Sequence, residues 1–416
     1  MQNASSMQNA ECRMQNEKPG KQNGFSFCIL HSAFCIGLVA AVFHAAVLAA
    51  YVAAFHGDLS ALVCVARERL GQTPYEHIHT GFDRNGYDGQ FYYAIARAPW
   101  SRHDLGIDAP AIRQARILYP AVSWLLSAGD AHRLLWVMPL VNLLAIAALA
   151  ALGAIVARGH GLSPWWGVLL PFAVNAGMPA LRNLTDVLST LTVAALLIAW
   201  LRRWPWWVLS LCAAAALFSR EQNVVVVLLV FVFALTSPER QRRVSSPRRW
   251  RSGLVVQSPL IAGLLGALLL WSVWLCVLRI LYGSWSLLPT GGNMGPPLAG
   301  MLYRWTHLTS ESRSFAIFHL ICMLTLTLQL GLSLWLLRTA GDRLIHLVAL
   351  AGAGLAIMGG LALYGDNWSY TRVFAWLPLG VWLGCVQARW RWPLVALSAP
   401  CVLPLAVLVR VWLAPV

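Results

Sequence analysis

Residues Phe27 to Phe55 read FCILHSAFCIGLVAAVFHAAVLAAYVAAF, an apolar run without a single Asp, Glu, Lys or Arg. About 20 such residues suffice for an α-helix to cross the hydrocarbon core of a bilayer. Lipid offers no hydrogen-bond partners, so the run must satisfy its backbone internally as a helix. It is too long for the core of a signal peptide and lacks a convincing small-residue cleavage site. The run therefore predicts a retained first transmembrane helix.

Similar apolar runs recur along the 416-residue chain, which is 58% hydrophobic and only 11% charged. Soluble domains carry roughly 25% charged residues. The pattern predicts an all-α polytopic membrane protein of about eleven transmembrane helices. The predicted spans are residues 27–55, 132–157, 164–181, 185–201, 204–219, 222–236, 254–282, 314–337, 344–364, 370–387 and 393–414.

Basic residues fall in short bursts between the apolar runs, and the densest burst is residues 237–252. Lys and Arg collect on the cytoplasmic loops of membrane proteins, so this loop sets the orientation. The same orientation places three further pairs inside: Arg202 and Arg203, Arg338 and Arg343, and Arg389 and Arg391. We therefore expect a cytoplasmic N-terminus and an extracytoplasmic C-terminus.

The net charge of +15 is explained by this topology. The basic residues do not form a continuous domain with interleaved aromatics, so no nucleic-acid partner is expected. Under the same orientation most acidic residues lie outside, and the exceptions are Glu11, Glu17, Glu239 and Asp342. Acidic residues contribute little to the orientation rule, so their asymmetry is an independent observation. It predicts chemistry at the extracytoplasmic face.

Residues 1–26 are polar, repeat Met-Gln-Asn and carry no apolar period, so we expect a disordered cytoplasmic N-terminus. The repeat leaves Met7 and Met14 open as alternative starts of translation. Residues 27–416 are predicted to form a single membrane domain.

Two hydrophilic segments of that domain are predicted to be extracytoplasmic. The first loop, residues 56–116, is too long and too rich in Asp, His, Tyr and Arg to be a mere connector. We expect it to carry short interfacial helices and the active site. The second loop, residues 283–313, is rich in Gly and Pro.

The first loop contains the stretch Tyr87-Asp88-Gly89-Gln90-Phe91-Tyr92-Tyr93-Ala94-Ile95-Ala96. Its spacing predicts a short amphipathic helix, stopped before Pro99, whose apolar stripe lies on the membrane interface. The stripe comprises Tyr87, Phe91, Ala94, Ile95 and Ala98.

Asp88 would lie in the first turn of this helix, beside Tyr92. Unpaired N–H groups and the helix dipole favour an ionised carboxylate there. An ionised carboxylate suits a residue that orients an acceptor hydroxyl or holds a cation, and is less ideal for a general base. The alternative interpretation is that Asp88 only caps the helix.

Four arginines lie at the predicted outer ends of helices: Arg116, Arg182, Arg220 and Arg372. Charged residues near membrane spans are costly and tend to be paired or functional. The planar guanidinium group matches phosphate oxygens. The four arginines therefore predict a site for the phosphate or pyrophosphate of a lipid. The alternative is snorkelling and local pairing, Arg182 with Asp186 and Arg220 with Glu221.

Metal binding has weak support in the sequence. His77 and His79 follow Glu76, but this short loop gives no further ligand of clear spacing. The nine cysteines contain no CxxC pair, and no disulfide framework is implied. Metal ligands are left unassigned.

The order of parts resembles the GT-C superfamily of integral-membrane glycosyltransferases, which take a sugar from a polyprenyl-phosphate carrier. A first helix followed by a long outer loop with an acidic residue near an aromatic segment is the pattern of that superfamily. The stretch from Tyr87 to Ala96 looks like that of its mannosyltransferase-like members. Arg116 to Pro120 and Phe218 to Glu221 are similar to stretches of bacterial proteins of this kind. The resemblance covers most of the chain in layout through short motifs.

The resemblance implies transfer of a sugar to a cell-surface glycan or lipid acceptor, with inversion at the anomeric carbon. Asp88 matches the acidic residue at the junction of acceptor and donor, and is the candidate catalytic residue. Many members carry paired acidic residues here, whereas Asp83 lies five residues upstream, so a divalent cation is left open as a cofactor. The candidate substrate-binding residues are Tyr92, Arg116, Tyr119, Arg182, Asp186, Arg220, Glu221 and Arg372.

Two other functions remain open. Outer arginines would equally bind an anionic head group in a transporter or lipid flippase, although no internal repeat is evident. In a non-enzymatic assembly subunit, Asp88 would be dispensable.

Overall fold

The computed structural model describes residues 19–82, 86–99, 106–236, 253–287, 292–308, 313–366 and 369–413. Helices dominate these residues. Their one sheet consists of two short parallel strands, β1 (Val65–Ala66) and β2 (Gly81–Phe82). The prediction of an all-α protein is confirmed.

Five helical stretches of the described chain are long and apolar enough to cross a membrane. Four belong to α2 (Pro19–Ala54), α6 (Ala131–Gly159), α13 (Gly253–Tyr282) and α15 (Arg313–Leu336). The fifth, Trp392–Leu413, combines α20 (Trp392–Ala396), η5 (Ala399–Cys401) and α21 (Val402–Leu413). The stretches support a membrane-embedded protein.

Shorter apolar helices account for several of the other predicted spans. They are α9 (Asp186–Leu201), α10 (Trp206–Ser219), α11 (Val224–Thr236) and α16 (Arg343–Ile357). By length alone they do not establish a crossing, so the number of eleven is not confirmed.

Three predicted spans are interrupted. Span 164–181 consists of η3 (Pro164–Val168), α7 (Leu169–Ala173) and α8 (Gly177–Ala180). Span 344–364 is divided into α16, which ends at Ile357, and α17 (Leu361–Gly365). Span 370–387 is divided into α18 (Ser369–Arg372) and α19 (Trp376–Gln387).

The interruptions have local causes. Between α7 and α8, Asn175 has a left-handed backbone with φ 51°. Gly359 and Gly360 follow α16, and glycine lowers the stability of a helix interior. The apolar pattern correctly predicted buried segments, but it gave no signal for these breaks.

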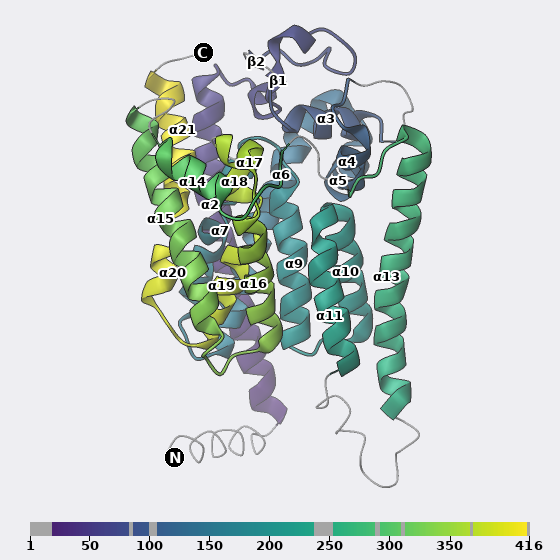
Figure 1. The fold of residues 1–416 in the computed structure, drawn as a ribbon, viewed down its shortest axis with the longest axis vertical. Helices are drawn as coiled ribbons and strands as arrows, with labels where there is room; N and C mark the ends of the chain where they lie inside the picture. The colour runs from purple at the N-terminus through teal and green to yellow at the C-terminus, as the bar shows by residue number, and fades with distance from the viewer. Residues whose placement is uncertain are drawn as a thin grey trace.

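The first loop folds into compact structure. It contains α3 (Gly89–Arg97) and α4 (Pro110–Ala115), and α5 (Leu118–Ser127) follows it. Figure 1 shows these helices beside β1 and β2 at one end of the bundle, which we call the loop end. A further short helix, α14 (Ala299–Thr306), lies in the second loop.

The expected membrane-facing stripe of α3 is wrong. All residues from Gly89 to Ala96 are buried, and the helix packs on α5 and α6. Protein covers both the polar and the apolar face of this nine-residue helix, so the helix cannot present an apolar face to lipid. Protein therefore covers α3 where we had expected the bilayer.

The prediction of a disordered segment at residues 1–26 stays a prediction. Helix α2 begins at Pro19. Residues 1–18, the basic loop 237–252 and Asp83 lie outside the described residues.

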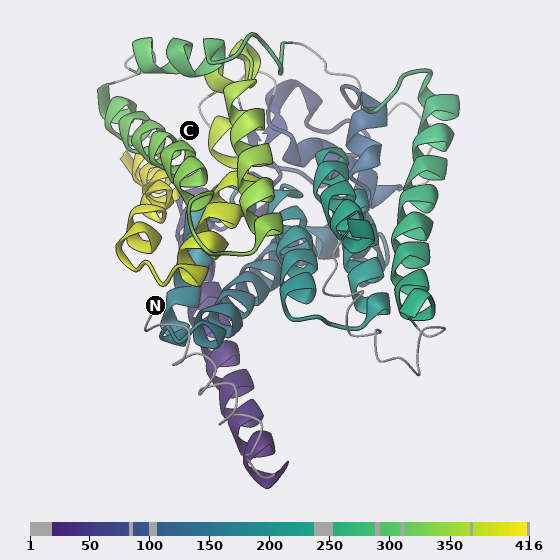
Figure 2. The ribbon, with the colours of Figure 1, turned by 60° about the horizontal axis from the view of Figure 1, so that its bottom comes forward.

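The long helices form two groups. In Figures 1 and 2, α15, α16, α19 and α21 gather on one side and α10, α11 and α13 on the other, with α9 between them. Helix α2 packs against α6 and α21. Helix α11 contacts α16, which joins the two groups. The loop end lies above this junction.

Close helix contacts predict which glycines the fold requires. A Cβ on Gly380 of α19 would lie 2.8 Å from the backbone nitrogen of Ala349 on α16, whereas one on Gly354 would meet nothing within 4 Å. Overpacking costs about 1 to 3 kcal/mol. We expect Gly380→Ala to lower the free energy of unfolding by that amount and Gly354→Ala to leave it unchanged or raise it slightly. Chemical denaturation in detergent measures both, and equal effects would contradict the close packing.

Candidate functional site

A cavity of about 520 Å³ opens at the loop end. Four separate stretches of chain line it: part of the first loop, the connection between α10 and α11, part of the second loop, and the segment from α16 to α18. Its wall includes Asp88, Arg113, Arg116, Arg220, Glu221, Asp366 and Arg372. Charged side chains distant in the sequence thus share one cavity.

Asp88 lies at the N-cap position of α3, but its carboxylate makes no capping hydrogen bond. One oxygen, Oδ1, lies 2.9 Å from Nη2 of Arg113, and Oδ2 lies 3.0 Å from Nη2 of Arg372. The side chain is 21% exposed. The alternative of a simple helix cap is therefore wrong, because the carboxylate is directed to two arginines of the cavity wall.

The arginines determine the ionisation of Asp88. Burial by itself would raise the pKa of this carboxyl, but the positive charges of Arg113, Arg372 and Arg116 outweigh it and hold the pKa well below its usual range. Asp88 is therefore ionised at neutral pH, as the sequence predicted. A carboxylate of such low basicity orients a hydroxyl group better than it removes a proton.

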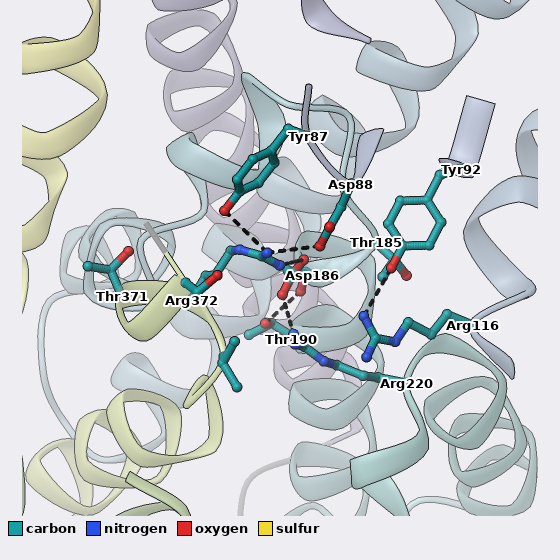
Figure 3. A network of polar contacts seen from close by, with 12 residues as sticks. Tyr87, Asp88, Tyr92, Arg116, Thr185, Asp186, Thr190, Arg220, Thr371 and Arg372 are labelled. Atoms are coloured by element: carbon teal, nitrogen blue, oxygen red, sulfur yellow. Dashed lines mark hydrogen bonds and ion pairs between the residues drawn. The ribbon is translucent and has the colours of Figure 1, made fainter. Parts of the chain in front are cut away.

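Asp186, the first residue of α9, joins two of the arginines. Its Oδ1 accepts a hydrogen bond from Nη1 of Arg220, and its Oδ2 lies 3.1 Å from Nη1 of Arg372. The Asp186 side chain is 3% exposed. Figure 3 shows the resulting series in which Asp88, Arg372, Asp186 and Arg220 alternate in charge.

Arg116 forms a second ion pair. Its Nε and Nη2 donate to the two carboxylate oxygens of Glu221 at 2.8 and 2.6 Å, and Nη1 donates to the hydroxyl of Tyr92 at 3.1 Å. This fork geometry is among the strongest of protein hydrogen bonds. It fixes the end of the first loop to the connection between α10 and α11.

The local ion pairs of the alternative interpretation do not form. Arg182 lies in the turn before α9, out of helical register with Asp186, and donates to the Tyr51 hydroxyl at 2.7 Å. The backbone of Arg220 is extended, with φ −162°, so its side chain diverges from that of Glu221. Tertiary packing replaced both neighbours with distant partners.

Four predicted binding residues do not line the cavity: Tyr92, Tyr119, Arg182 and Asp186. Arg182 is held between Tyr51 and Cys64, with its guanidinium carbon 5.5 Å from the centre of the Phe82 ring. The Tyr119 hydroxyl donates to the Met138 carbonyl at 3.0 Å, and the residue is fully buried. Tyr92 reaches the site through Arg116.

The sequence analysis missed several polar residues of the wall, among them Arg113, Tyr87 and Asp366. Arg113 binds both Asp88 and Asp108, and its position one turn before Arg116 was the available signal. Tyr87 donates to Asp366 at 3.1 Å, although it had been assigned to a lipid-facing stripe. Asp366 had no signal beyond its place near a predicted helix end.

No group of three or more His, Cys, Asp or Glu side chains suited to a metal ion occurs among the described residues. His77 packs on His132 with ring centroids 4.5 Å apart. The arginines in the cavity wall supply the positive charge there.

Comparison with known proteins gives no match: no family model, no curated protein and no solved structure resembles this chain significantly. The argument for function therefore depends on the residues of the cavity.

Removing the carboxylate of Asp186 would leave buried arginine charge uncompensated. Breaking a buried pair costs about 3 to 5 kcal/mol, whereas an exposed pair contributes about 1 kcal/mol or less. We expect Asp186→Asn to lower the free energy of unfolding by about 3 to 5 kcal/mol, the cost of breaking a buried pair. The control Asp108→Asn, whose side chain is 57% exposed, should lower it only by the smaller amount, about 1 kcal/mol or less. Denaturation in detergent measures both, and similar losses would contradict the central place of Asp186.

The lowered pKa of Asp88 predicts how stability depends on pH. A carboxyl whose pKa falls on folding stabilises the protein above the pKa of the unfolded state, about 3.9, and loses this contribution as pH decreases toward the folded value. We expect the stability difference between wild type and Asp88→Asn to be constant from pH 7 to 5 and to diminish below about pH 4. Thermal unfolding across this range tests it. A difference that already diminishes at pH 6 would contradict an ionised, paired Asp88.

Proposed function

We propose that this protein is a membrane glycosyltransferase that transfers a sugar from a polyprenyl-phosphate donor to a glycan or lipid acceptor of the cell surface. The observation that carries the proposal is the position of Asp88, an ionised carboxylate in the wall of a cavity that also contains four arginines. Sugar transfer from a phosphate donor requires two kinds of group: a carboxylate that acts on the acceptor hydroxyl and an anion-binding group that stabilises the leaving phosphate.

The arginines differ in how fully they are engaged. Arg116 donates from Nε, Nη1 and Nη2 to Glu221 and Tyr92. By contrast, the Nε atoms of Arg220 and Arg372 are buried and have no hydrogen-bond partner among the described residues. We therefore assign the donor phosphate to Arg220 and Arg372, and to Arg116 a role in holding the wall in place.

In the proposed reaction, the acceptor oxygen forms a bond to the anomeric carbon as the bond from that carbon to the phosphate oxygen breaks. The leaving phosphate takes the electron pair, and the arginines stabilise its developing charge. Asp88 orients the acceptor hydroxyl, and the proton of that hydroxyl passes to the leaving phosphate. No divalent cation is needed for this charge balance, although one is compatible with it.

The cavity also has an apolar part suited to a lipid carrier. Its lining includes Leu287 and Met294 of the second loop and Leu355 and Leu363 near the break between α16 and α17. An isoprenoid chain could lie against these side chains while its phosphate reaches the arginines. The acceptor would enter from the side of the first loop.

For the topology we propose eleven crossings in a bacterial inner membrane. Helix α2 begins at the end of the bundle opposite the loop end, and α21 finishes near the loop end (Figure 1), which agrees with an odd number of crossings. The basic loop at residues 237–252 would then be cytoplasmic and the cavity extracytoplasmic. Neighbouring membrane lipids would surround the bundle.

The alternative function is a transporter or flippase for an anionic lipid-linked substrate. The interruption between α7 and α8 and that between α16 and α17 favour it, because substrate sites of transporters often lie at broken helices. Such a protein would move the lipid without breaking its bond to the sugar.

Transfer of radiolabelled sugar from polyprenyl-phosphate donors to membrane extracts tests the enzyme directly. We expect Asp88→Asn to reduce the rate by roughly 100-fold, the loss that misplacement of a reacting group by about 1 Å can cause. Asp130→Asn is a matched control, because Asp130 caps α6 outside the cavity and should leave the rate unchanged.

Expression and membrane insertion of the variants must be equal for this comparison. Equal product from wild type and Asp88→Asn would remove Asp88 from the mechanism. No product with any donor, together with movement of labelled lipid across vesicles that contain the protein, would favour the flippase.

A further inference from the structure

Part of the second loop is attached to the break between α16 and α17. The backbone nitrogen of Leu298 donates to the Ile357 carbonyl at 2.7 Å, and that of Gly360 donates to the Asn293 carbonyl at 2.8 Å. Helix α14 then packs on α17. Gly300 permits this approach, since a Cβ there would lie 2.4 Å from the Gly359 carbonyl oxygen.

Arg304 of α14 is buried at this contact, with an exposed fraction of 1%. Its Nε donates to the Tyr364 carbonyl at 2.6 Å and its Nη2 to the Gly365 carbonyl at 2.9 Å. The guanidinium carbon also lies 5.6 Å from the centre of the Tyr370 ring. One cation thus contacts two backbone acceptors of α17 and an aromatic ring of α18.

The two carbonyls lie at the C-terminal end of α17, where a helix leaves acceptors without an internal partner. A cation at this end is also favoured by the helix dipole. Because α17 has only five residues, its own hydrogen bonds fix its direction weakly. The hydrogen bonds from Arg304 are therefore a main contribution to the orientation of the end of α17.

The residues after that end form one wall of the cavity. Asp366 follows Gly365 directly and accepts hydrogen bonds from Tyr87 and Ser369. Arg372 ends the next helix, α18, and contacts both Asp88 and Asp186. Arg304 itself does not line the cavity, so any influence on the reaction must pass through this turn.

We propose that Arg304 is a positioning residue, which fixes the turn at Tyr364 and Gly365 so that Arg372 faces Asp88 and Asp366 faces Tyr87. This inference rests on the proposed function for its kinetic consequence, but not for its structural one. The second loop would then determine the geometry of the cavity wall at Asp366 and Arg372, although the loop itself contributes few charged groups to that wall.

The test compares Arg304→Gln, Arg304→Lys and the control Arg279→Gln in the full-length protein. Glutamine removes the cation, whereas lysine keeps a charge and one donor for the carbonyls. Arg279 lies at the end of α13 over the Trp285 ring at 5.9 Å and does not line the cavity. Hydrogen exchange measured by mass spectrometry, and kcat and KM for the labelled donor, are the two readouts.

For Arg304→Gln we expect the amides of residues 361–366 and 369–373 to exchange roughly tenfold faster, with α13 unchanged. We also expect kcat to fall roughly tenfold while KM for the donor changes less than about twofold, because Arg372 would miss the charge that develops in the transition state. Arg304→Lys should recover part of both effects. The control should show neither.

Exchange unchanged in Arg304→Gln would overturn the proposal whatever the activity. Faster exchange with an unchanged kcat in an active enzyme would also overturn it, because the turn would then not matter to the reaction. If wild type transfers no sugar, the proposed function fails, and the exchange measurement alone decides whether Arg304 holds the turn. A global rise in exchange would reduce Arg304 to a general packing residue and reject the positioning role.

Discussion

The contact of Asp186 with Arg220 and Arg372 is the interaction on which the rest of the site depends. It joins the start of α9, the end of α10 and the end of α18 in a region that is almost fully buried. Removing charged groups from water is costly unless each is paired, so these three helix ends cannot separate independently. Arg372 then extends the same charge balance to Asp88, which connects the buried core of the network with the open cavity.

The broken helices explain how so many charged groups reach one cavity in an apolar bundle. A continuous helix places only its ends outside the hydrocarbon layer, whereas an interrupted one brings loop residues to intermediate depth, provided that protein surrounds them. The break after α16 allows the second loop to bind there through its backbone and through Arg304. The same break places Asp366 and Arg372 opposite the first loop. The break after α16 and the charged residues of the cavity wall therefore occur at the same place in the fold.

Partner choice is where reasoning from the sequence was least accurate. Arg116, Arg220 and Arg372 were identified because charge at the edge of an apolar run is rare. The only partners considered were neighbours in the chain, Asp186 for Arg182 and Glu221 for Arg220. Instead, Glu221 binds Arg116 from 105 residues away, and Asp186 lies 186 residues from Arg372. Such separations leave no local pattern in a single sequence.

By itself, the sequence determined that this chain is helical and suited to a membrane, because apolar length is a local property that lipid makes obligatory. It also indicated Asp88 and three of the arginines, since local rules penalise charge near apolar runs. Only the tertiary structure decided that α3 is buried under protein, that Arg182 and Tyr119 lie away from the cavity, and that Arg113 belongs to it. Those outcomes depend on which helix ends meet, and side-chain pairing over long sequence distances is set by packing of the whole bundle.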